Sequence, residues 1–114
     1  MGLFGKKRNE YEEASRSLNS DQFASDRLVI EQMTDNDERA AKLIDQMKNG
    51  YPLILNFEDL EPLAANKLLA FFAGASYALE GKSVKINDKT FLFARKVDFL
   101  DGSLQRFIDN LPRS

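Results

Sequence analysis

One stretch of the sequence, residues 62–79, has the pattern of a helix with almost no polar face. It begins with Pro62, which suits the first turn of a helix, and its only charged residue is Lys67. At 100° per residue, one arc carries the large apolar side chains that we expect in the core: Phe71, Leu68, Leu79, Phe72 and Leu69. The opposite arc is apolar as well: Ala70, Gly74 and Ala78, flanked by Leu63, Ala73 and Tyr77. Since a helix that is apolar all round is normally buried all round, this helix needs cover on two sides.

The small residues of the second arc suggest what the cover is. A glycine inside a helix costs about 1 kcal/mol relative to alanine, so Gly74 should be offset by some gain. Small residues at i, i+4 spacing let another backbone approach closely. We therefore expect a second copy of the chain to pack on Ala70, Gly74, Tyr77 and Ala78. The alternative is that a C-terminal amphipathic helix over residues 103–111 covers this arc within one chain.

Hydrophobic periodicity predicts the other elements of the chain. The expected strands cover residues 27–33, 51–57, 83–86 and 90–94. A further helix begins after Thr34 or Asp35, with Glu38 placed for a capping box, and stops at Gly50. The order β-α-β-α-β-β-α predicts a compact two-layer α/β sandwich. It divides into a short, flexible N-terminal arm (1–25), an α/β domain (26–99) and a C-terminal helix (100–114).

The composition excludes several classes of function. The chain has no cysteine and no histidine, so the usual soft metal ligands and the commonest general base are absent. We therefore expect no enzyme activity, no metal and no other cofactor. A net charge of −2 gives no basic footprint for nucleic acid. No apolar run approaches the 18 residues of a membrane span, and the N-terminus lacks the apolar core of a secretory signal, so we expect a cytoplasmic protein.

The last two strands place a cation beside aromatic rings. Phe91 and Phe93 point to one side of their strand, and Lys85 points away from Val84 and Ile86 on the preceding strand. Lys85 is either an ordinary solvated strand residue or, together with an aromatic ring on the same sheet, part of a site for an acidic, apolar peptide.

The N-terminus combines an apolar tip with a basic triplet. Leu3 and Phe4 can insert into a membrane while Lys6, Lys7 and Arg8 meet anionic head groups, each basic residue contributing about 1 kcal/mol. Three nearby glutamates oppose this binding, so it should be weak for each chain. The alternative is a tail with no membrane role.

Two segments carry a resemblance to a known family. YPLILNFEDLEPLAANKLLAFFAGASYALEG (51–81) and SVKINDKTFLFA (83–94) resemble, in order and spacing, the SepF family of bacterial division proteins. Asn56 and Leu60 match its "INLxxL" element, and Gly74 and Tyr77 fall within its "FLxGxxYALxG" element.

The resemblance implies an adaptor that self-associates, binds the C-terminal tail of the tubulin-like protein FtsZ and tethers FtsZ filaments at the inner face of the membrane at the division site. It implies that Gly74 is the self-association glycine, that Lys85 and Phe91, with neighbouring Phe93, hold the tail, and that residues 1–8 are the anchor. The alternative function is a small-molecule-binding regulatory domain of ferredoxin-like type. That alternative predicts glycine-rich loops at the strand ends.

Overall fold

The computed structural model describes residues 22–112. Their helices and strands follow in the order η1 (Ala24–Arg27), β1 (Val29–Gln32), α2 (Asp37–Lys48), β2 (Leu53–Asn56), α3 (Pro62–Ala78), β3 (Gly81–Asn87), β4 (Thr90–Arg95), η2 (Lys96–Phe99) and α4 (Ser103–Asp109), where η marks a short 3-10 helix. The predicted order β-α-β-α-β-β-α is confirmed, with one 3-10 turn before β1 and another before α4.

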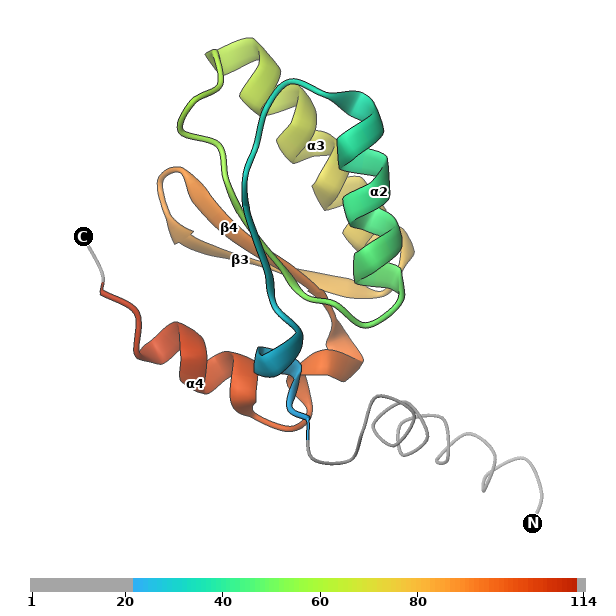
Figure 1. The fold of residues 1–114 in the computed structure, drawn as a ribbon, viewed down its shortest axis with the longest axis vertical. Coiled ribbons are helices and arrows are strands. Elements are labelled where there is room, and N and C mark those ends of the chain that lie inside the picture. Colours follow the sequence, from blue (N-terminus) through green and yellow to red (C-terminus); the bar gives the residue numbers. More distant parts are fainter. Residues whose placement is uncertain (1–21, 113–114) are drawn as a thin grey trace, which may run out of the picture.

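The four strands form one mixed sheet in the order β1-β2-β4-β3. β1 and β2 are parallel, as expected of strands joined through a helix, and the other neighbours are antiparallel. Helices α2 and α3 lie side by side over one face of the sheet, whereas α4 lies beyond the other face (Figure 1). The expected α/β sandwich is therefore confirmed, and α4 adds partial cover on its second face.

Strand β2 is buried on both faces, as its unbroken apolar sequence predicts. Leu53 and Leu55 point under α2 and α3, where they pack with Phe57 and Phe93. Ile54 points to the other face, where it packs with Leu92 of β4 and Leu104 of α4. The sheet thus separates two apolar cores, one beneath each set of helices.

The C-terminal helix belongs to the second core and not to the Gly74 arc. Leu104 and Ile108 of α4 are buried against β2 and β4, so the alternative in which residues 103–111 cover Gly74 is wrong. Ala24 is also buried in this core. The structured unit therefore begins before residue 26 and continues through α4.

Two expected element boundaries are also corrected. The side chain of Asn36, not of Thr34 or Asp35, caps α2, because its Oδ1 accepts a hydrogen bond of 3.0 Å from Arg39 N. Arg27 does not start β1, because its guanidinium turns inward, donates to Gly50 O at 2.8 Å and pairs with Asp98 at 3.1 Å. Gly50 has a φ of 99°, which suits a glycine at the end of a helix.

Candidate functional site

The buried side of α3 is narrower than its sequence suggests. Leu68 and Phe72 face the core with Ser76, whose hydroxyl lies 3.8 Å from the sulfur of Met47. Phe71, which we expected in the core, is 43% exposed, because it lies one residue off the buried line, and its ring is edge-on to that of Phe72. The apolar surface left outside is therefore larger than expected.

The second arc of α3 is open in the single chain. We define the α3 arc as Leu63, Ala70, Gly74, Tyr77 and Ala78, all of which are exposed. Leu63 is 85% and Tyr77 87% exposed, although both are large apolar side chains. A Cβ added to Gly74 would meet nothing within 4 Å. Nothing within the described chain explains the glycine.

The hairpin brings Lys85 and Phe91 together, as predicted. They face each other directly across β3 and β4, so their side chains share the helix-covered face of the sheet. The side chain of Lys85 is 61% exposed and lies 3.4 Å from Asp88 in the turn. Phe91 is half-buried, and its ring is edge-on to that of Phe57, with 6.0 Å between the ring centroids. A cation and a partly open ring are therefore available side by side.

Phe93, which we expected in the tail site, is buried in the single chain. The side chain is 1% exposed and stacks between Phe72 at 5.4 Å and Phe91 at 6.3 Å. Alternation put Phe91 and Phe93 on one face correctly, but β4 runs under α3, and only Phe91 reaches the edge of that cover. Phe93 supports the ring of Phe91 from below.

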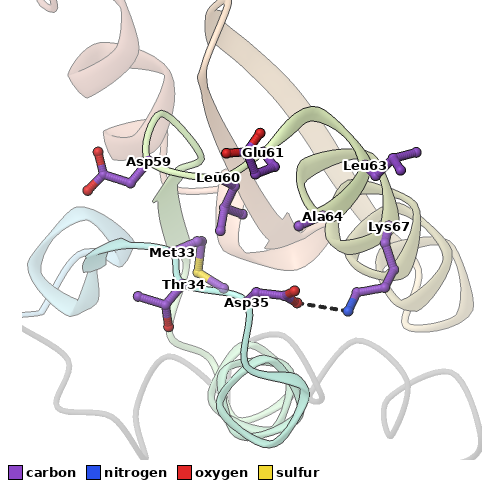
Figure 2. A pocket seen from close by; sticks show the side chains of 9 residues that line it. All are labelled: Met33, Thr34, Asp35, Asp59, Leu60, Glu61, Leu63, Ala64 and Lys67. Atoms are coloured by element: carbon purple, nitrogen blue, oxygen red, sulfur yellow. Dashed lines mark hydrogen bonds and ion pairs between the residues drawn. The ribbon is translucent and has the colours of Figure 1, made fainter.

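The structure adds a hollow that the sequence patterns did not predict (Figure 2). Its volume is about 600 Å³, and its lining consists of Met33, Thr34, Asp35, Asp59, Leu60, Glu61, Leu63, Ala64 and Lys67. It lies where β1 and β2 end and α3 begins. The signal was present in the sequence, because polar residues that follow two parallel strands gather at the same edge of a sheet.

Side-chain hydrogen bonds shape the walls of this hollow. Asn56, at the end of β2, accepts a hydrogen bond from Glu58 N at 2.7 Å and donates to the Thr90 hydroxyl at 3.2 Å, which positions the loop that follows. On the other wall, Lys67 of α3 bonds Asp35 at 2.8 Å and lies 3.2 Å from Asp37. The hydrogen bonds to Asp35 and then to Asp37 raise the pKa of Lys67, which therefore stays charged.

The described residues test the expectations about a membrane and a metal only in part. Leu3, Phe4, Lys6, Lys7 and Arg8 lie outside them. None of the helices within 22–112 is long and apolar enough to cross a membrane. In that same range, no group of three or more acidic side chains is arranged to hold a metal ion.

Comparison with known proteins agrees with the resemblance in the two segments. Residues 28–97 match the family described as Cell division protein SepF. This chain belongs to the SepF family. The match runs from just before β1 into η2, so it includes the α3 arc and the hairpin but not α4.

Individual members of the family show how far the similarity extends. The chain is 35% identical over 75 residues to the Cell division protein SepF of Alkaliphilus oremlandii, covering 66% of this chain and 51% of that protein. It is 34% identical over 73 residues to that of Alkaliphilus metalliredigens (64% and 49%) and 43% identical over 51 residues to that of Coprothermobacter proteolyticus (45% and 37%). The chain therefore spans about half of the length of the two Alkaliphilus proteins and a smaller share of the Coprothermobacter protein. Its membership supports a role in cell division.

Proposed function

We propose that this SepF family member is a non-enzymatic adaptor of cell division that self-associates, binds the C-terminal tail of FtsZ and attaches weakly to anionic membrane. The observation that carries the proposal is the open α3 arc, where a methyl group added to Gly74 would meet nothing within 4 Å. An apolar surface of this kind on a small domain is typical of a surface for association.

Self-association follows from the shape of the arc. Gly74 and Ala78 leave the backbone of α3 accessible, so a second helix can approach closely, while Leu63 and Tyr77 supply apolar area at the two ends. Pairing of like copies through one patch generates a twofold contact in which each arc covers the other. The cost of Gly74 to the stability of α3 would then be offset by the contact between the two copies.

Binding of the tail would use Lys85 and Phe91. The ammonium of Lys85 can pair with a carboxylate of the peptide, and the open edge of the Phe91 ring can contact an apolar side chain. An exposed ion pair contributes only about 0–1 kcal/mol, so each site would bind weakly. Assembly through the α3 arc would present several sites together and raise the avidity for filaments that display many tails.

The membrane part of the proposal rests on the sequence of the N-terminal segment. Leu3 and Phe4 would insert, and residues 6–8 would meet the head groups of anionic lipids. Weak attachment of each chain would again be multiplied by assembly. Tail binding and membrane attachment would therefore both depend on assembly through the α3 arc.

Titration of the full-length chain with a peptide of the FtsZ C-terminal tail tests the site. Lys85→Glu reverses the charge beside Phe91 and should weaken binding at least about tenfold, the equivalent of roughly 1.4 kcal/mol. Lys42→Glu, on the exposed side of α2, makes the same change in net charge away from the hairpin and should bind like the parent chain. Calorimetry measures both affinities.

Phe91→Ala provides a second test of the apolar half of the site. Because the ring packs on Phe57, the thermal unfolding of this variant must be measured beside its binding. Loss of binding in a folded Phe91→Ala variant supports the assignment. Unchanged affinity in both Lys85→Glu and Phe91→Ala would refute it.

A further inference from the structure

The hollow at the ends of β1 and β2 combines an apolar floor with an apolar wall. Its apolar floor is formed by Leu60 and Ala64, which are half-buried and lie over the fully buried Met33, and the exposed Leu63 of α3 bounds it on the outside (Figure 2). A volume of about 600 Å³ is within the usual range for sites that hold a small ligand or a few side chains. The Lys85–Phe91 pair does not use this space, and the α3 arc shares only Leu63 with it.

The surroundings of the hollow are acidic. Among residues 22–112, four carboxylates lie at or beside its rim, on Asp35, Asp37, Asp59 and Glu61, with a single ammonium, on Lys67. That ammonium is already paired with Asp35 and Asp37, while Asp59 makes one hydrogen bond, to Gln32. The site is therefore suited to an occupant with an apolar tip and a positive flank.

The N-terminal segment of this chain has that chemistry. Residues 2–8 read GLFGKKR, so Leu3 and Phe4 are followed, after one glycine, by three basic residues. The two glycines around the apolar pair allow the backbone to approach a surface closely. Leu3 and Phe4 can therefore contact the apolar floor of the hollow, and the basic residues 6–8 can lie along its acidic rim.

The chain is long enough for this contact within one molecule. Gln22 and Met33 are 11 residues apart, so the root of the segment lies no more than about 40 Å from the hollow. Phe4 and Gln22 are 18 residues apart, and a chain of that length reaches up to about 60 Å. A tether of this length gives an effective concentration on the order of millimolar, so a weak contact suffices.

We propose that the N-terminal segment of this chain docks in its own acidic hollow, with Leu3 and Phe4 on the floor and residues 6–8 along the carboxylate rim. Docking hides the same side chains that would insert into a membrane. A consequence, which rests on the proposed membrane attachment, is that an anionic surface competes with the hollow for the segment. The contact would hold single chains off the membrane until an anionic surface is available.

Tryptophan fluorescence tests the docking without lipid. The chain contains no tryptophan, so Phe4→Trp places a single reporter at the apolar tip of the full-length protein. Its emission should be shifted to the blue and protected from acrylamide at every protein concentration. The added pair Asp59→Lys and Glu61→Lys should abolish both effects, and the milder pair Asp59→Asn and Glu61→Gln should reduce them.

The matched control carries Asp45→Lys and Asp109→Lys, which change the net charge equally at exposed positions outside the hollow. It should keep the blue-shifted emission. Emission from a solvent-exposed tryptophan in the parent, or the same emission in both lysine variants, would overturn the docking. A blue shift that grows with protein concentration would also overturn it, because the segment would then occupy another copy.

Binding to vesicles of phosphatidylglycerol and phosphatidylcholine tests the competition. If nine chains in ten are docked, freeing the segment should raise the apparent affinity about tenfold in the hollow variant relative to the control variant. Equal affinities would overturn the competition. Failure of all variants to bind vesicles would refute the membrane attachment alone, whereas the emission without lipid decides the docking independently.

Discussion

Two glycines on and after α3 have opposite environments. A Cβ at Gly81 would lie 2.7 Å from the terminal methyl of Met47, 2.8 Å from Ala94 O and 3.0 Å from Ser76 O. Two of these neighbours are backbone atoms, which cannot move without shifting β4 or the end of α3. A Cβ at Gly74 would meet nothing within 4 Å. The first glycine is required for packing within the chain, and the second is not.

Alanine substitutions should therefore change stability in opposite directions. Gly81→Ala should lower the free energy of unfolding by about 1–3 kcal/mol, because the site is overpacked. Gly74→Ala should raise it by about 0.5–1 kcal/mol, because alanine favours a helix interior. Urea unfolding at low protein concentration measures both. A Gly81→Ala variant as stable as the parent chain would contradict the contact distances.

Helix α4 depends on a small hydrogen-bond network at its start. With seven residues it is too short to be stable alone. The carboxylate of Asp101 accepts hydrogen bonds from Ala24 N at 2.9 Å and from Ser103 N at 2.8 Å, which ties η1 to the beginning of α4. Burial alone would raise the pKa of Asp101, but these hydrogen bonds, with one from the Ser103 hydroxyl, hold it below its ordinary value.

Asp101→Asn should loosen α4 while α2 and α3 stay protected. The amide nitrogen of asparagine cannot accept the second backbone hydrogen bond, so the free energy of unfolding should fall by about 1–3 kcal/mol. Because the folded pKa is lowered, the contribution of Asp101 is present above the unfolded pKa and is lost as pH falls through the folded one. In hydrogen-exchange measurements at neutral pH, the amides of α4 should exchange faster in the variant than in the parent chain. In acid, α4 of the parent chain should lose this protection as well.

Asp109→Asn is the matched control, since Asp109 lies at the other end of α4 and, among the described residues, accepts a hydrogen bond only from Gln105 on the surface. It should exchange like the parent chain. If Asp101→Asn left α4 as protected as this control, the network would not be what anchors the helix.

For the whole molecule, the open α3 arc connects the fold to the proposed assembly. One face of the sheet is covered by α2 and α3, and the other is partly covered by α4, but the outer side of α3 has no cover within the described residues (Figure 1). The proposed tail site at Lys85 and Phe91 and the acidic hollow both lie on the side of the sheet that α2 and α3 cover. Assembly through α3 would therefore bring the sites of several copies together.

Gly74→Lys should prevent that assembly and leave the fold intact. The added side chain points into solvent in the single chain, but in a packed interface it would bury an unpaired charge. Self-association should weaken at least about tenfold in sedimentation experiments. Ala41→Lys, at an exposed position of α2, adds the same charge elsewhere and should assemble like the parent chain. Normal assembly of the Gly74→Lys variant would count against an interface on the α3 arc.

Local patterns determined the elements of this protein. The order of strands and helices, the burial of β2 on both faces, the surplus apolar arc of α3 and the pairing of Lys85 with Phe91 all follow from periods of 2 and 3.6 and from turn residues. These properties depend on residues close together in the chain, so the sequence is sufficient to predict them.

The tertiary structure decided how the elements meet. It placed α4 against the second face of the sheet, moved Phe71 outward while turning Ser76 inward, and buried Phe93 beneath Phe91. The sequence already indicates that polar residues after β1 and β2 lie at one edge of the sheet, but the tertiary structure gave the hollow there its shape and its contact with α3. These outcomes depend on the angle and offset at which distant segments pack, and no local period in the sequence carries that information.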